Sequence, residues 1–163
     1  MLARMLRLIL CLGFVQLSGI LPAIAAEGLT MIRPENLGGA VEKTVTMAEL
    51  RALPQVTLKV DTEWFDGTRT YSGPLARDVV QIIGKGTGTT AHLTAVNDYA
   101  IDVPLQDFDT YDVILALDMD GVALSIRDKG PIWIMYPMND HPELRDPVTN
   151  GKLIWQLVRL EVQ

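Results

Sequence analysis

Aromatic and cationic side chains gather near the C-terminal end of the sequence, where they could form a binding pocket. Trp133, Tyr136 and Trp155 follow Arg127 and Lys129 along the chain. Rings supply a large contact area, and a cation at the mouth of such a pocket can orient a small anionic group. The same rings could instead be core residues or cross-strand pairs. Both interpretations stay open, because a shift of one residue in strand register exchanges the two faces of a strand.

A second set of residues suggests a metal site. Met138, Asp140 and His141 lie close together in the sequence, and thioether, carboxylate and imidazole groups can bind copper or zinc. The other histidine, His92, falls in an expected strand and is too distant from His141 in the sequence to form a metal motif with it. A metal-binding protein is therefore an alternative with little support from spacing.

The single cysteine, Cys11, lies in a segment typical of a secretory signal peptide. Two arginines precede an apolar run over residues 8–24, and the run ends in small residues. We expect cleavage after Ala25, export to the periplasm, and a mature chain with neither a disulfide nor a thiolate site. A transmembrane anchor is the alternative, but the run is short for a span and is interrupted by polar residues, glycines and a proline.

Length and charge limit the classes of function. The 163 residues suit one domain, and a hydrophobic content of 48% is enough for a core. The formal net charge is −6, and it would become −8 on loss of residues 1–25, which hold two arginines and no acidic residue. An acidic surface disfavours nucleic acid as a partner, because phosphate neutralisation needs a basic one.

The pattern beyond the signal segment predicts an α+β domain, dominated by mixed β-structure, with two or three short helices. Residues 26–45 are expected to form an N-terminal arm with one strand near 29–32, and residues 46–163 the domain proper. Helices are expected after the capping box of Thr46 and Glu49, from Ser72-Gly73-Pro74 to Gly84, and over 105–111. Strands are expected at 56–62, 92–96, 99–103, 113–117, 122–126, 131–136 and 153–162, with a polar loop at 139–150.

Several motifs occur in a familiar order between residues 53 and 162. They are Tyr71-Ser-Gly-Pro-Leu, the stretch from Leu93 to Pro104 with its Asn97-Asp-Tyr99, Asp118-Met-Asp-Gly, Lys129-Gly-Pro-Ile-Trp-Ile-Met-Tyr-Pro137 and Ile154-Trp-Gln-Leu-Val. In this order they resemble the molybdopterin-binding domain of the sulfite oxidase family, and especially its short, single-domain exported members. The resemblance covers about two-thirds of the chain and implies a mixed β-dominated fold.

The resemblance also implies three departures at the family's cofactor site. The enzymes' molybdenum-ligating cysteine would fall near Val60, an arginine of the family corresponds to Trp133, and a lysine corresponds to Trp155. A thiolate and two cations are thus replaced by apolar or aromatic side chains, which removes the main attraction for an anionic pterin phosphate.

The favoured hypothesis is therefore a periplasmic, non-enzymatic binding or sensory accessory protein on a reduced molybdopterin-domain scaffold, without a cofactor. Its partner would be a small-molecule ligand or a periplasmic or membrane protein, with no membrane span after signal cleavage. The alternative is a molybdopterin-dependent oxidoreductase that holds the cofactor through other groups. The expected ligand-binding residues are Trp133, Trp155, Tyr136, Asn97, Tyr99, Arg127 and Lys129.

Overall fold

The computed structural model describes residues 28–163, so the expected signal peptide, its cleavage site and Cys11 lie outside the described residues. The strands are β1 (Gly28–Arg33), β2 (Val41–Thr46), β3 (Gln55–Thr62), β4 (Phe65–Pro74), β5 (Thr90–Ala95), β6 (Ala100–Pro104), β7 (Ile114–Ala116), β8 (Asp118–Met119), β9 (Val122–Ala123), β10 (Trp133–Met135) and β11 (Leu157–Val162). The α-helices are α1 (Met47–Ala52), α2 (Ala76–Gln81), α3 (Leu105–Thr110) and α4 (Pro147–Lys152). Short 3-10 turns are η1 (Glu35–Leu37), η2 (Ile126–Asp128) and η3 (Pro142–Leu144).

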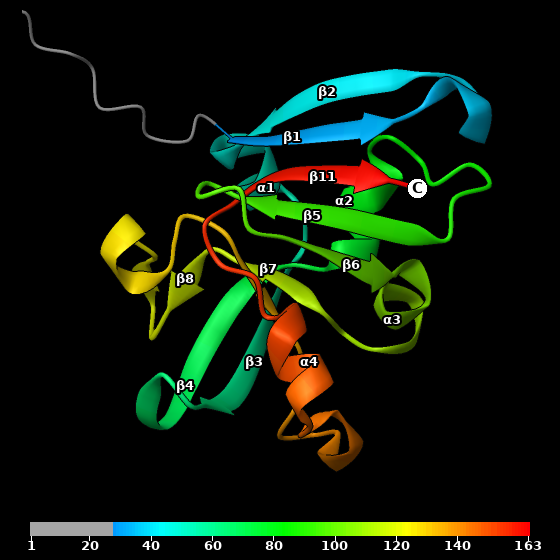
Figure 1. Cartoon of the computed structure of the whole chain (residues 1–163). Helices are drawn as coiled ribbons and strands as arrows, with labels where there is room; N and C mark the ends of the chain where they lie inside the picture. The colour runs from blue at the N-terminus through cyan, green and yellow to red at the C-terminus, as the bar shows by residue number, and fades with distance from the viewer. Residues whose placement is uncertain (1–27) are drawn as a thin grey trace, which may run out of the picture.

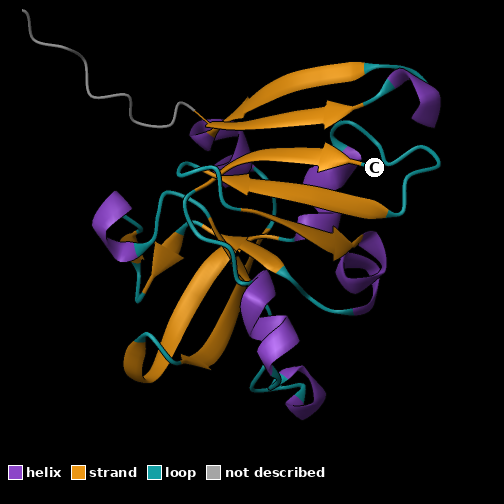
Figure 2. Cartoon of the chain, viewed as in Figure 1, coloured by secondary structure: helices purple, strands orange, loops and turns teal. Residues whose placement is uncertain are grey.

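Two sheets organise the fold. A five-stranded sheet has the order β2-β1-β11-β5-β6, and a four-stranded sheet has the order β3-β4-β8-β9. Figure 1 shows the five-stranded sheet above the β3–β4 hairpin, with α4 below β6. The helices are short and lie around the strands (Figure 2). This architecture confirms the expected β-dominated α+β class, and α4 is a helix beyond those expected.

The N-terminal residues of the described chain belong to the larger sheet. We expected an arm with one strand, but β1 lies between β2 and β11, and it pairs with β11 in parallel. Leu29 and Met31 are completely buried on the core face of β1. The sequence signal is weak because only these alternate positions face the core, too few to stand out as a pattern.

The strands β7 and β10 form a separate antiparallel pair, and every residue in both is buried. Their sequences are accordingly apolar throughout, with no alternation, as expected for strands covered on both faces. This pair contributes six residues of 0% exposure to the core.

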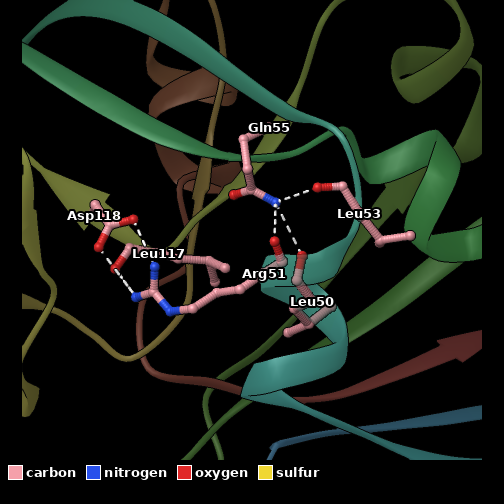
Figure 3. Close-up of polar contacts among 6 residues, drawn as sticks. All are labelled: Leu50, Arg51, Leu53, Gln55, Leu117 and Asp118. Atoms are coloured by element: carbon pink, nitrogen blue, oxygen red, sulfur yellow. Dashed lines mark hydrogen bonds and ion pairs between the residues drawn. The ribbon is translucent and has the colours of Figure 1, made fainter.

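The helix α1 begins and ends as its sequence predicts. The Thr46 hydroxyl accepts a hydrogen bond from the backbone N–H of Glu49, and the Glu49 carboxylate accepts one from the Thr46 N–H at 2.8 Å. At the other end, the Gln55 side-chain amide donates to the carbonyl oxygens of Leu50 and Leu53, at 3.0 and 2.8 Å (Figure 3). Both ends therefore have hydrogen-bond partners for backbone groups that a helix leaves free.

Arg51 joins α1 to the four-stranded sheet. Its guanidinium donates two hydrogen bonds to the carboxylate of Asp118 on β8, at 2.8 and 3.1 Å (Figure 3). The bidentate contact raises the pKa of Arg51 above its usual value, mainly through the hydrogen bonds to Asp118.

Ser72-Gly73-Pro74 does not open a helix, contrary to the prediction. The three residues end β4, and α2 begins at Ala76. Gly73 is needed because β4 approaches β7 closely: a Cβ at this position would lie 1.8 Å from the carbonyl oxygen of Leu115. Gly-Pro here thus marks a close approach of two strands, whereas in the sequence it looked like a helix start.

The predicted polar loop at 139–150 contains η3 and α4. Asp146 caps α4, because its carboxylate accepts hydrogen bonds from the backbone N–H groups of Val148 and Thr149 at 2.7 and 3.2 Å. Pro147 occupies the first turn, where its missing N–H is not needed. Asp146-Pro147 was the sequence signal for α4. The polar composition of residues 139–150 led us to predict a loop instead.

Replacing Gly73 by alanine tests the close approach of β4 to β7. The new methyl group would force two backbones apart, so Gly73→Ala should lower the free energy of unfolding by about 1–3 kcal/mol, measured by urea denaturation. Gly151→Ala on α4 is the matched control, since its Cβ would meet only Ile101 at 3.9 Å. Equal stability of the two variants would contradict the packing described for Gly73.

Candidate functional site

All three tryptophans of the chain meet in one cluster, although they come from distant parts of the sequence. Trp64 lies in the β3–β4 turn, Trp133 in β10, and Trp155 just before β11. The ring of Trp64 packs edge-to-face on Trp133 and Trp155, with centroids 5.6 and 5.3 Å apart. We call Trp64, Trp133 and Trp155 the tryptophan cluster.

Trp133 is the buried member of the tryptophan cluster. It has 0% exposure, and its indole N–H donates a hydrogen bond to the carbonyl oxygen of Leu153 at 2.9 Å. The backbones of Trp133 and Trp155 form an antiparallel bridge. Residues opposed in such a bridge point to the same face, so this pairing brings the two rings together.

The ammonium group of Lys129 lies against all three rings. Its nitrogen is 3.7 Å from the ring centre of Trp155, 4.9 Å from that of Trp64 and 5.5 Å from that of Trp133. Burial lowers the pKa of Lys129 below its usual value, and the charge of Glu63 opposes that effect. Such contacts are attractive because the face of an aromatic ring is electron-rich. The tryptophan cluster therefore already holds one cation, supplied by the chain itself.

A pocket of about 660 Å³ opens beside the tryptophan cluster. Trp64, Trp155 and Tyr99 contribute aromatic rings to its lining, and Glu63, Asn97 and Asn150 contribute polar groups. The β3–β4 turn, the β5–β6 turn, α4 and the segment before β11 supply these residues. Its size is within the range of small-molecule sites. We call it the aromatic pocket.

The structure brings together some of the predicted site residues and separates others. Asn97, Tyr99 and Trp155 line the aromatic pocket. Trp133 and Tyr136 are completely buried and do not line it, and Arg127 is an exposed residue of η2. Burial on both faces of β10 explains the core position of Trp133.

Lys129 also differs from its expected role. We expected it, or Arg127, at a pocket mouth, facing an anion, but neither residue lines the aromatic pocket and the Lys129 ammonium packs on the rings. The sequence did not predict Glu63, Trp64 or Asn150 as pocket residues. Glu63 and Trp64 lie in the β3–β4 turn, and β4 was not expected. Asn150 lies in α4, which was not expected either.

Tyr136 belongs to a separate network that fastens α4. Its hydroxyl donates a hydrogen bond to the Asp107 carboxylate of α3 at 2.8 Å, and the ammonium of Lys152 on α4 lies 2.7 Å from the same oxygen. Burial raises the pKa of Tyr136 far above its usual value, and the neighbouring Asp107 carboxylate adds to this effect. The network links α3, α4 and the end of β10, and so positions the α4 wall of the aromatic pocket.

The residues of the alternative metal site make other contacts. Met138 is buried with 4% exposure, while His141 lies 3.2 Å from the Glu143 carboxylate and packs edge-to-face on Tyr111. Across residues 28–163 no three His, Cys, Asp or Glu side chains are grouped so as to hold a metal ion. Within the same range no helix has the length and hydrophobicity needed to span a bilayer.

Comparison with known proteins identifies the fold. No protein-family model and no curated protein matches the sequence. Among solved structures, the chain is similar to the crystal structure of the sulfane dehydrogenase SoxCD from Paracoccus pantotrophus, with a TM-score of 0.56 and 15% identity. The similarity covers 85% of this chain but only 39% of that one, so this chain spans well under half the length of that protein. The fold expected from the resemblance, that of a sulfite oxidase molybdopterin domain, is confirmed.

The residues of the aromatic pocket do not fit the molybdopterin that the sequence resemblance implies. Among residues 28–163, Glu63 is the only charged side chain in the lining, so these residues offer a polyanionic cofactor no cation there. Val60, near which the resemblance puts the molybdenum ligand, is completely buried and apolar. A carboxylate facing a phosphate is repulsive, and an alkyl group cannot replace a thiolate.

Replacing Tyr136 by phenylalanine separates a structural role from a ligand-binding one. Loss of a hydrogen bond to a charged carboxylate should lower the free energy of unfolding by about 1.5–3 kcal/mol at neutral pH, measured by urea denaturation. Above pH 10, the usual pKa of tyrosine, unfolding lets Tyr136 ionise while folding keeps it protonated. The wild type therefore loses stability there, and its advantage over the variant should shrink.

Tyr99→Phe is the control for this measurement. Tyr99 is 51% exposed, so removal of its hydroxyl should change the free energy of unfolding by less than about 0.5 kcal/mol. If the difference in the free energy of unfolding between the wild type and Tyr136→Phe grows above pH 10, the assignment of Tyr136 to the α3–α4 network is wrong.

Proposed function

We propose that this chain is a periplasmic binding or sensory accessory protein that holds a small ligand in the aromatic pocket. The observation that carries the proposal is the pocket itself, about 660 Å³ in volume, with Trp64, Tyr99 and Trp155 in its lining. Aromatic rings with a few well-placed polar groups are typical of small-molecule sites. Lys129 and the buried ring of Trp133 hold Trp64 and Trp155 in place, so the aromatic lining is formed before a ligand arrives.

Location in the periplasm rests on the pattern of the first 26 residues, with basic residues before an apolar run and small residues after it. An exported domain with a preformed pocket suits the capture of a ligand or its presentation to a periplasmic or membrane partner. Nucleic acid is not proposed as a partner, since the chain is acidic.

The second candidate is a molybdopterin-dependent oxidoreductase. The fold shared with the sulfane dehydrogenase SoxCD supports it. The lining of the aromatic pocket argues against it, because Glu63 is its only charged group. A direct measurement of the metal distinguishes the two candidates.

The full chain, expressed with residues 1–27 and recovered from the periplasmic fraction of its native host, provides the test. We expect mass spectrometry of the denatured protein to detect a released small molecule in near-equimolar amount, and elemental analysis to detect no molybdenum. Trp155→Ala should release far less of that molecule, since it removes a ring from the pocket lining. Circular dichroism would confirm that the variant is folded.

Asn36→Ala is the matched control, because Asn36 is exposed in η1 and does not line the aromatic pocket. It should carry the same small molecule as the wild type. One molybdenum per chain would establish the oxidoreductase instead. Equal release from the wild type and Trp155→Ala would contradict a ligand site in the aromatic pocket.

A further inference from the structure

The charges around the aromatic pocket restrict the chemical class of its ligand. The lining contains one charged side chain, the exposed carboxylate of Glu63, and no lysine, arginine or histidine. An anionic ligand would meet this carboxylate without any cation in the lining to bind it. The acidic balance of the whole chain, 20 acidic residues against 14 basic ones, adds repulsion at longer range.

A cationic ligand is disfavoured for a different reason. Rings such as those of Trp64 and Trp155 attract ammonium groups, but the Lys129 ammonium already lies 4.9 and 3.7 Å from their centres. A second cation on the same rings would be repelled by the first. Burial lowers the pKa of Lys129, and the charge of Glu63 partly offsets this effect, so this carboxylate already interacts with a cation of the chain.

The polar groups of the pocket are available to a neutral ligand. The side chains of Asn150 and Glu63 make no hydrogen bond to any other residue in the range 28–163. The Asn97 side-chain oxygen accepts a bond from the Tyr99 backbone N–H at 3.2 Å, which leaves its amide hydrogens free to donate. Amides both donate and accept, and a carboxylate accepts, so together they match a set of hydroxyl groups.

We infer that the ligand of the aromatic pocket is a neutral carbohydrate, an inference that rests on the proposed binding function. The apolar C–H faces of a sugar ring pack against Trp64, Trp155 and the half-exposed Tyr99, while its hydroxyls bond to Asn97, Asn150 and Glu63. Neither the repulsion by Glu63 nor that by Lys129 acts on a ligand without charge.

Three sugars of similar size and different charge test this inference directly. Isothermal titration calorimetry of the full chain lacking only its expected signal segment would use N-acetylglucosamine as the neutral probe. Glucosamine is the cationic probe and glucuronate the anionic one, and maltose and cellobiose extend the neutral set. We expect saturable binding of at least one neutral sugar, with quenching of tryptophan fluorescence. The two charged analogues should bind at least about tenfold more weakly, a difference of about 1.4 kcal/mol.

Asn150→Ala is a better test than Asn97→Ala. The Asn150 side chain makes no hydrogen bond within residues 28–163, whereas the Asn97 side chain also stabilises the β5–β6 turn. It should weaken sugar binding at least about fivefold, because the side-chain hydrogen bonds of Asn150 to the sugar are lost, without a change in melting temperature. Asn36→Ala should bind sugar as the wild type does.

The outcomes separate this inference from the proposed function. The carbohydrate assignment would be overturned if none of the neutral sugars gave heat or fluorescence quenching at concentrations up to about 10 mM. A dissociation constant above that concentration is too weak for a specific site. Equal binding of glucosamine and N-acetylglucosamine would also overturn the assignment. If choline or thiosulfate binds instead, in a manner that Trp155→Ala abolishes, the ligand class is wrong but the aromatic pocket remains a binding site. If no sugar, choline or thiosulfate binds and the protein from its native host releases no molecule, the binding function itself fails.

Discussion

The indole of Trp133 is the contact on which the arrangement of the site depends. It is completely buried, its N–H is bonded to the Leu153 carbonyl, and its ring packs on Tyr71 as well as on Trp64 and Trp155. These neighbours come from β4, from the β3–β4 turn and from the segment that leads into β11. One side chain thus joins the four-stranded sheet to the segment that leads into β11, the central strand of the five-stranded sheet. Each edge-to-face pair adds about 0.5–1.5 kcal/mol beyond the area buried.

The other wall of the aromatic pocket depends on charge. The short helix α4 would be marginal by itself, since most helical stability comes from tertiary contacts. Asp146 caps its first turn, and hydrogen bonds from Thr149 and from the backbone lower the pKa of Asp146. At its other end, Lys152 shares the Asp107 carboxylate with the Tyr136 hydroxyl. Both ends of α4 are therefore held, which places Asn150 at the pocket.

Fold and chemistry separate in this protein. A TM-score of 0.56 over 85% of the chain relates its fold to that of the sulfane dehydrogenase SoxCD, at 15% identity. The side chains near the tryptophan cluster are a lysine that packs on aromatic rings, amides and one carboxylate. Function depends on such groups rather than on the scaffold, so similarity of fold does not transfer an activity.

The sequence alone determined the local features whose causes lie within a few residues. These include the capping box of α1, the helix α3, the β5–β6 hairpin and the buried run of β10, because capping, turn chemistry and hydrophobicity act over short distances. It also gave the β-dominated class and, through ordered motifs, the fold. Asn97, Tyr99 and Trp155, which the same motifs predicted as ligand-binding residues, line the aromatic pocket.

Only the tertiary structure decided which rings face the core and which face the pocket. Trp133 and Trp155 look equivalent in the sequence, but one lies in a strand buried on both faces and the other at the rim of a cavity. Trp64 joins them across a separation of about 70–90 residues, which no local pattern can reveal. Lys129 likewise became a partner of the tryptophan cluster because its ammonium is brought against three rings from distant segments. Long-range packing sets the positions of these side chains. Each position depends on the register and burial of whole strands, which a single residue does not determine.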